Sequence, residues 1–140
     1  CKEIIVEVKR DLKREGIPFS NQVQLGIMVE TPSAAIVSDL LAPEVDFFSV
    51  GTNDLFQYTL AVDRQNEMLS SYCDDRNEAV LRLIRMTAES GKKHGVWTGI
   101  CGELAASPEL TEWFVDIGIA ELSMVPSAIL AVRARLAELD

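Results

Sequence analysis

Apolar residues follow two different periods along this chain. Within residues 4–12 they recur at the spacing of one helical face, and Gly16 and Pro18 then end the predicted helix. A short apolar run over residues 25–29 is typical of a buried strand that ends at Glu30. The chain is therefore predicted to begin with a helix and to continue with a strand.

A second helix and a second strand are predicted next. Thr31 can cap the start of this helix, Pro32 suits its first position, and the helical pattern extends to about Leu41. The second strand is predicted over residues 47–50. Residues 51–75 are then predicted to form a long polar-rich connection, and loops of that length tend to be functional.

The second half of the chain repeats the alternation of helices and strands. Asn77 can cap an amphipathic helix that Gly95 ends. The remaining predicted elements are a strand over residues 96–100, a helix over 107–118, a strand over 121–124 and a last helix from Pro126. Strands that alternate with helices indicate an α/β fold with a parallel sheet.

The pattern amounts to four strand–helix units with a leading helix. Such a set is half of a TIM barrel, (β/α)₈, whose usual length is about 250 residues. An open doubly wound sheet is the alternative, but the glycine-rich phosphate loop that a dinucleotide-binding fold carries after its first strand is missing. We therefore predict that residues 1–140 form one partial barrel domain.

Composition and charge exclude several classes of protein. The chain has 140 residues, 48% hydrophobic and 25% charged, and no apolar run approaches the roughly 20 residues that a membrane-spanning helix needs. A net charge of −9 argues against a nucleic-acid partner, because such binding relies on Lys and Arg at the phosphates. The start at Cys1, without an initiator methionine or a signal pattern, indicates a piece of a longer protein.

The three cysteines are Cys1, Cys73 and Cys101, and they form no CxxC pair. Neither a disulfide framework nor a zinc site is therefore indicated, and a reducing cytoplasm fits best. Cys73 is interpreted as a small buried apolar residue.

Three residues with useful chemistry lie at or just after the ends of predicted strands, namely Glu30, Asp54 and Cys101. Barrel enzymes carry their catalytic groups at this end of the strands. Two carboxylates, a phosphate-bearing substrate and waters make a typical Mg²⁺ site, because Mg²⁺ prefers hard oxygen ligands. Alternatively, Glu30 stabilises the start of the following helix and Asp54 forms a turn.

Weaker candidates are found beside these positions. Arg64 could clamp a phosphate or carboxylate or simply lie on the surface, and Asn53 could donate beside the metal or form a turn. Cys101 precedes Gly102, where a small substrate can approach closely, and its thiol could act as a general acid or base or as a small buried apolar group. His94 is interpreted as structural, because positive side chains suit the end of a helix.

Four separated segments together resemble the family of enzymes that use phosphoenolpyruvate (PEP). They are Gly26–Ala35, Val45–Leu55, Gln57–Arg64 and Gly99–Ala105. They follow one another in the order of the family, and the resemblance extends from about Leu25 to the end of the chain. It implies a PEP-binding domain that is the carboxy-terminal half of a TIM barrel.

The resemblance also implies a role for each candidate residue. Glu30 and Asp54 are implied to bind Mg²⁺, the expected cofactor. Asn53 and Arg64 are implied to contact the phosphate of PEP, and Cys101 is implied to protonate the enolate carbon. In this mechanism the metal and arginines neutralise the phosphoryl oxygens as the group leaves.

Within the family, the segments Tyr58–Arg64 and Cys101–Ala105 resemble the phosphoenolpyruvate–protein phosphotransferases, the enzyme I group of the sugar phosphotransferase system. This implies transfer of the phosphoryl group to a protein histidine and release of pyruvate. The implied partners are a phosphohistidine domain, a histidine phosphocarrier protein and a second copy in a homodimer. His94 does not match the phosphohistidine motif, so the fragment itself is expected to be catalytically incomplete.

Two alternatives remain open within this resemblance. The barrel could belong to a pyruvate phosphate dikinase or a phosphoenolpyruvate synthase, or the isolated segment could act only as a dimerisation module. The chain also departs from the family pattern at Phe56, where threonine is expected, and within residues 72–76, which lack the usual proline. Both departures concern the substrate loop and remove no proposed ligand.

Overall fold

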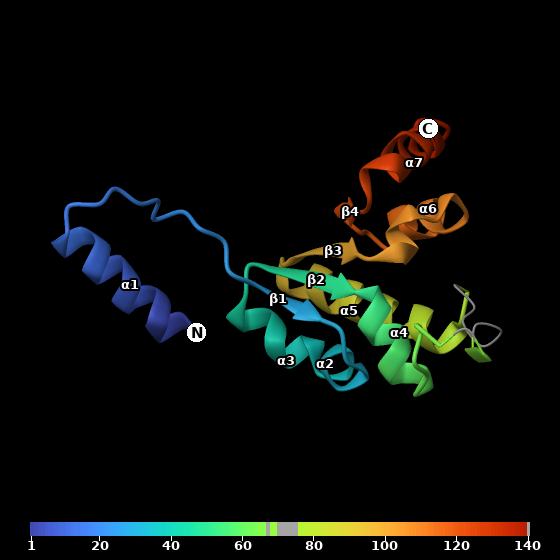
Figure 1. Ribbon diagram of the computed structural model, residues 1–140, viewed down its shortest axis with the longest axis horizontal. Helices are drawn as coiled ribbons and strands as arrows, with labels where there is room; N and C mark the ends of the chain where they lie inside the picture. Colours follow the sequence, from blue (N-terminus) through green and yellow to red (C-terminus); the bar gives the residue numbers. More distant parts are fainter. Residues whose placement is uncertain (67, 70–75, 140) are drawn as a thin grey trace.

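The computed structural model of the protein describes residues 1–66, 68–69 and 76–139 (Figure 1). A parallel sheet of four strands forms its centre, and the strands are arranged in sequential order. They are β1 (Gly26–Val29), β2 (Phe47–Gly51), β3 (Trp97–Cys101) and β4 (Glu121–Ser123). The predicted α/β class and the four predicted strands are confirmed, and no strand boundary differs by more than one residue from its predicted position.

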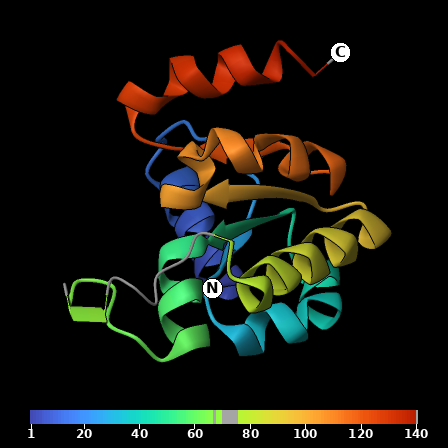
Figure 2. The same ribbon diagram turned by 90° about the vertical axis from the view of Figure 1, so that its right-hand side faces the viewer.

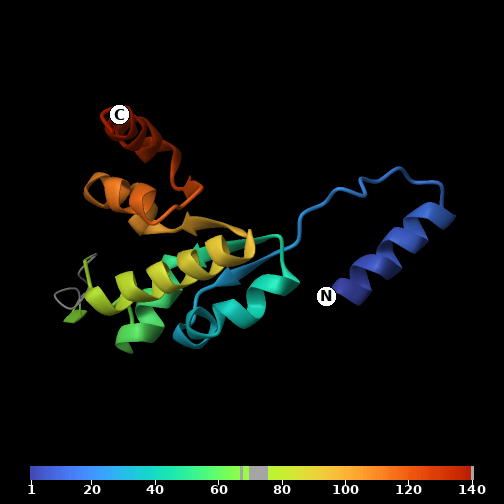
Figure 3. The ribbon, with the colours of Figure 1, turned by 180° about the vertical axis from the view of Figure 1, so that it is seen from behind.

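Helices follow each strand and cover one face of the sheet. The helices are α1 (Lys2–Arg14), α2 (Pro32–Ile36), α3 (Ser38–Leu41), α4 (Thr52–Leu60), α5 (Glu78–His94), α6 (Pro108–Asp116) and α7 (Ile129–Leu136). Figure 2 shows α2, α3, α5 and α6 in an arc around this face, and Figure 3 shows α5 lying across it. None of the described helices is long and apolar enough to cross a membrane.

The two faces of the sheet differ in their side chains. On the helix-covered face, Val29, Phe48, Val50 and Ile100 are buried in the core. Strand alternation directs the residues between them to the opposite face, which no described helix covers (Figure 1). Met28 on that face is 48% exposed.

On the uncovered face, residues that pair in register on neighbouring strands form rows across the sheet. The first row includes Phe47 and Trp97, whose rings stack with centroids 4.5 Å apart. The second row consists of Met28, Ser49, Gly99 and Glu121, and the third of Gly51, Cys101 and Ser123. The third row lies at the carboxyl ends of the strands, so this register places Cys101 between two neighbours on the rim.

Local sequence signals explain several helix ends. Thr31 Oγ1 accepts a hydrogen bond from the Ala34 N–H at 3.3 Å, and Asn77 Oδ1 accepts one from the Ala79 N–H at 3.1 Å. Gly95 ends α5 in the left-handed conformation, with φ of 71°. The single helix predicted from Thr31 to Leu41 is instead two short helices, α2 and α3, which meet at Val37.

The connection predicted over residues 51–75 is wrong in its first part, because Thr52–Leu60 form α4. The helix forms because Leu55 and Phe56 pack into the core that α5 and β3 share. The sequence pattern did not predict this helix because its first turn is polar. Asn53 and Asp54 therefore lie in a helix and not in the turn that was one of their two predicted alternatives. Residues 67 and 70–75 lie outside the described residues, as does the interpretation of Cys73.

The leading helix α1 is confirmed but lies apart from the sheet (Figure 1). Its Lys2 Nζ donates to Glu44 Oε2 at 2.7 Å, and this hydrogen bond and the lysine charge lower the pKa of the Glu44 carboxyl. The apolar stripe of the helix remains open to solvent, since Ile4 is 61% exposed. Within the described residues, α1 therefore adds little to the core.

Candidate functional site

The carboxyl ends of the strands bring the predicted site residues to one edge of the sheet. Cys101 pairs in register with Gly51 on one side and Ser123 on the other. Glu30 directly follows β1, the strand beside β2. Asp54 lies in the first turn of α4, directly after β2. Because parallel strands end at the same edge, these residues lie on one rim, as the sequence predicted for Glu30, Asp54 and Cys101.

Gly51 leaves room for the Glu30 carboxylate. A Cβ atom at Gly51 would lie 3.0 Å from the Cβ of Glu30 and 3.1 Å from its Oε2. A larger residue at position 51 would therefore push the half-buried Glu30 side chain away. The carboxylate is thus held beside the backbone that leads directly into the first turn of α4, which contains Asp54.

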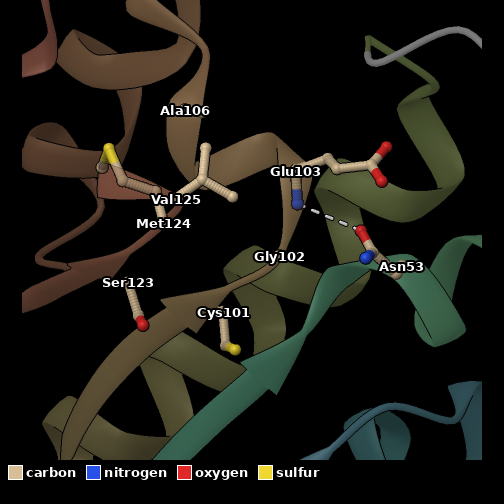
Figure 4. Close-up of a pocket in the computed structure, with 8 residues that line it drawn as sticks. All are labelled: Asn53, Cys101, Gly102, Glu103, Ala106, Ser123, Met124 and Val125. Carbon is tan, nitrogen blue, oxygen red and sulfur yellow. Dashed lines mark hydrogen bonds between the residues drawn. The ribbon is translucent and has the colours of Figure 1, made fainter. Parts of the chain in front are cut away.

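Two hydrogen bonds join the start of α4 to the segment after β3. Thr52 is fully buried, and its Oγ1 donates to the carbonyl oxygen of Cys101 at 3.2 Å. The backbone N–H of Glu103 donates to Asn53 Oδ1 at 3.0 Å (Figure 4). This bond assigns the orientation of the Asn53 amide, so both N–H groups of Nδ2 remain available, and no described residue accepts from them.

Gly102 lies between these two contacts and has no space for a side chain. Its φ of +125° favours glycine, and a Cβ atom would lie 2.5 Å from Thr52 Oγ1 and 2.9 Å from Asn53 Oδ1. The sequence analysis expected Gly102 to let a substrate approach. In the structure its small size also permits the close packing of β3 against the start of α4.

A pocket of about 500 Å³ opens at this rim (Figure 4). It is lined by Asn53, Cys101, Gly102, Glu103, Ala106, Ser123, Met124 and Val125. The volume falls within the range of about 300–1,000 Å³ that is common for small-molecule sites. Its lining combines an amide, a thiol, a hydroxyl and the carboxylate of Glu103 with apolar groups, so it can bind a small ligand that has both polar and apolar parts.

Arg64 approaches the pocket from the segment after α4. Its Nη1 donates to Glu103 Oε1 at 3.1 Å, while its backbone N–H donates to Gln57 Oε1 at 3.5 Å. The Arg64 side chain is 34% exposed and that of Glu103 is 78% exposed. Arg64 does not itself line the pocket, and its connection to the pocket is through Glu103.

The two carboxylates predicted to bind a metal are Glu30 and Asp54. Neither has a hydrogen-bond or ion-pair partner among the described residues, and that part of the chain holds no cluster of three or more His, Cys, Asp or Glu residues. A site with two oxygen donors fits Mg²⁺, which commonly uses one or two carboxylates together with substrate phosphates and waters. It does not fit a metal that the protein encloses with its own ligands.

The structure thus brings only some of the five predicted site residues to the same pocket. Asn53 and Cys101 line one pocket, and Arg64 reaches its rim. Glu30 and Asp54 belong to the same edge of the sheet but do not line the pocket. Their roles as ligands, and those of the other three residues, remain predictions.

The sequence analysis missed Thr52, Glu103 and Ser123. Ser123 ends β4 in the structure, whereas the strand predicted from the sequence extended to Met124, so the strand-end rule that identified Cys101 missed Ser123 by one position. Thr52 and Glu103 had no such signal. Their importance depends on contacts with residues about 40 to 50 positions away in the sequence.

Comparison with known proteins identifies the class of this domain. The family model for the PEP-utilising enzyme, PEP-binding domain, matches residues 1–140. The chain belongs to this family. Its curated relatives include a phosphoenolpyruvate-protein phosphotransferase of Priestia megaterium, 44% identical over 140 residues, and one of Listeria monocytogenes serovar 1/2a, 43% identical over 140 residues.

A third relative, a phosphoenolpyruvate-protein phosphotransferase of Staphylococcus aureus, is 44% identical over 136 residues, which is 97% of the chain. The chain spans only 24% of the length of each of these three relatives. Their shared name is therefore informative about the domain, while most of each relative has no counterpart in these 140 residues.

Proposed function

We propose that this chain contributes the PEP site of a phosphoenolpyruvate–protein phosphotransferase. The observation that carries the proposal is the rim pocket, which Asn53 and Cys101 line together and which Arg64 reaches through Glu103. Amide and guanidinium donors suit a phosphate, and a thiol suits proton transfer. The family match and the names of the relatives support the choice of PEP as the substrate.

The chain would form the carboxy-terminal half of a TIM barrel in the full-length protein. Two observations support this arrangement: the strands follow sequential order, and the helices cover only one face. A doubly wound sheet would carry helices on both faces. The rows on the uncovered face resemble the layers of side chains that fill a barrel interior, and further strands would also cover the open edges of β1 and β4.

PEP has a phosphate at one end and an apolar methylene group beside its carboxylate. Asn53 Nδ2 and the N–H groups of Arg64 that do not contact Glu103 can donate to the phosphate oxygens. Met124 and Val125 provide apolar surface for the methylene group in the same pocket as Cys101. The lining therefore has a suitable partner for each end of the substrate.

Glu30 and Asp54 would hold Mg²⁺ at the rim. When bound, the metal supplies positive charge that stabilises the phosphoryl oxygens as they accumulate negative charge. The support for this assignment is that both carboxylates lie at the carboxyl edge of the sheet without a partner among the described residues. Gly51 contributes by leaving space for the Glu30 side chain.

The reaction breaks the bond between the phosphorus and the enol oxygen of PEP. The phosphoryl group passes to a nitrogen of a histidine on another domain, and the enolate of pyruvate remains. Cys101 then gives its thiol proton to the methylene carbon, which becomes the methyl group of pyruvate. This role requires a reduced thiol, which fits a cytoplasmic protein.

The partners that follow from this proposal are a phosphohistidine domain, a histidine phosphocarrier protein and a second copy of the protein in a homodimer. We infer that the first two receive the phosphoryl group, since His94 is exposed at the end of α5 and does not line the pocket. Exposed apolar side chains on α7, such as Leu130 at 76%, support an association through this region.

The role of Cys101 can be tested in the full-length protein with the Cys101→Ala variant. We expect release of pyruvate to fall by at least about a hundredfold, the scale of general acid catalysis, while PEP still binds within about threefold of the wild-type affinity. A stopped assay of pyruvate formation measures the loss of turnover, and calorimetry separately measures the affinity for PEP. Full turnover in this variant would rule out Cys101 as the proton donor.

A further inference from the structure

Glu103 contacts both residues that are proposed to bind the phosphate. Its backbone N–H donates to Asn53 Oδ1 at 3.0 Å, and its carboxylate accepts from Arg64 Nη1 at 3.1 Å. Asn53 lies in the first turn of α4, whereas Arg64 lies in the segment beyond that helix. Glu103 is therefore the residue through which both are joined to the end of β3. Figure 4 shows its contact with Asn53.

We propose that Glu103 is a positioning residue that orients Asn53 and Arg64 for the phosphoryl group of PEP. The inference rests on the proposed function of the pocket. Glu103 acts through these two neighbours rather than on the reacting atoms.

The main-chain contact sets the direction of the Asn53 amide. Because Oδ1 faces the Glu103 N–H, the two donors of Nδ2 face elsewhere and are free for an anion. Replacing the Glu103 side chain leaves this backbone N–H in place. The two contacts of Glu103 can therefore be separated by experiment, and side-chain variants test the contact with Arg64.

The carboxylate contact limits the motion of Arg64 before substrate arrives. Arginine has many rotamers, and ordering such a side chain during binding reduces affinity. A guanidinium has five N–H donors, and Glu103 engages Nη1 alone, so the remaining donors can reach the phosphate. The Glu103 side chain of this pair is largely exposed, which makes the ion pair weak and sensitive to salt.

The negative charge of Glu103 could instead repel the phosphate. Repulsion and orientation of Arg64 predict opposite changes in the Michaelis constant for PEP when the carboxylate is removed. The Glu103 side chain is 78% exposed, so solvent screens its charge from the pocket. Orientation should therefore dominate, and removal of the carboxylate should raise KM.

The test uses the full-length protein with Glu103→Gln, Glu103→Ala and Glu103→Asp. For the Gln and Ala variants we expect KM for PEP to rise about two- to fivefold with kcat changed less than about twofold, as suits the loss of one exposed ion pair. Glu103→Asp should be intermediate, because it retains the charge with a shorter reach. Glu89→Gln, an exposed position on α5 outside the pocket, is the matched control and should leave KM unchanged.

A double-mutant cycle with Arg64→Ala separates this role from a general structural one. If Glu103 acts through Arg64, Glu103→Gln should raise KM no further in the Arg64→Ala background. The ratio of the KM values of Glu103→Gln and wild type should also approach one as ionic strength rises. If Glu103→Gln instead caused a general structural defect, it would still raise KM in the Arg64→Ala background and at high ionic strength.

Different results would overturn the role of Glu103 and the proposed function of the pocket. Additive effects in the cycle, an unchanged KM or a lower KM in Glu103→Gln would overturn the role of Glu103 while PEP turnover in the wild type upholds the proposed function. A wild-type protein that neither binds nor converts PEP would overturn both.

Discussion

At the scale of single residues, Gly102 alone among the described glycines combines a positive φ with a Cβ position that lies within 3.0 Å of other side chains. Its backbone conformation, with φ of +125°, is one that other residues rarely adopt, and its Cβ position is already occupied by the side chains of Thr52 and Asn53. The contacts on either side of it fix the carbonyl of Cys101 and the amide of Asn53. A change at this one position should therefore disturb several groups of the pocket together.

The substitution Gly102→Ala should lower the free energy of unfolding by about 1–3 kcal/mol, because Asn53 and Thr52 must move to admit a methyl group. PEP affinity should fall with it. Gly118→Ala is the control, since Gly118 also has a positive φ, of +82°, but no described atom lies within 4 Å of its Cβ position. Denaturant unfolding and calorimetry measure both variants, and equal losses of PEP affinity would contradict this account of Gly102.

The variant Asn53→Asp tests the assigned amide orientation. An aspartate keeps the oxygen that accepts from Glu103 but replaces the two N–H donors with a negatively charged oxygen. PEP affinity should fall at least about tenfold, which corresponds to about 1.4 kcal/mol, with little change in unfolding. Asn21→Asp adds the same charge at an exposed position before β1 and serves as the control. Undiminished PEP affinity in Asn53→Asp would show that Nδ2 does not contact the ligand.

At the scale of elements, the close contact of α5 with β3 holds the sheet and its rim in place. Gly91 makes this contact possible, because a Cβ atom there would lie 2.6 Å from Thr98 Oγ1 and 2.7 Å from the Val96 carbonyl oxygen. Ile84 and Val80 on the same helix contribute to the core that also contains Leu55 of α4. The position of α4, and hence of Asn53, depends on this packing.

Replacing Gly91 with alanine should therefore reduce the free energy of unfolding by about 1–3 kcal/mol, since α5 must move away from β3. Glu89→Ala, at an exposed position of the same helix, should stay within about 0.5 kcal/mol of the wild type. Chemical denaturation of both variants provides the comparison. A Gly91→Ala protein as stable as Glu89→Ala would mean that the contact can relax without cost.

The elements differ in how well the sequence predicted them. The strands were predicted because buried strands are short apolar runs, and α5 because Asn77 and Gly95 mark its ends. Helix α4 was not predicted, because its first turn is polar and its apolar residues are buried by a core that distant segments of the chain form. The rim was predicted for Glu30, Asp54 and Cys101 from strand ends, whereas no local pattern encodes the contact between Arg64 and Glu103.

At the scale of the whole molecule, the sheet has an uncovered face and open edges in the described part of the chain. In the proposed half barrel, further strands and helices would bury the exposed surface at Met28 and Ser123 on that face and at the stripe of α1 that includes Ile4. This is consistent with a chain that spans 24% of its relatives. The central claim, a magnesium-dependent PEP site on this rim, is therefore best tested in the full-length protein.

The most direct measurement is calorimetric titration of PEP into the full-length protein with Mg²⁺, with a chelator instead of Mg²⁺, and with Mg²⁺ in the Glu30→Gln and Asp54→Asn variants. The account predicts that wild-type protein binds PEP with Mg²⁺ and that affinity falls at least about tenfold, or about 1.4 kcal/mol, when either the metal or one carboxylate is removed. Equal PEP affinity under all four conditions would contradict it.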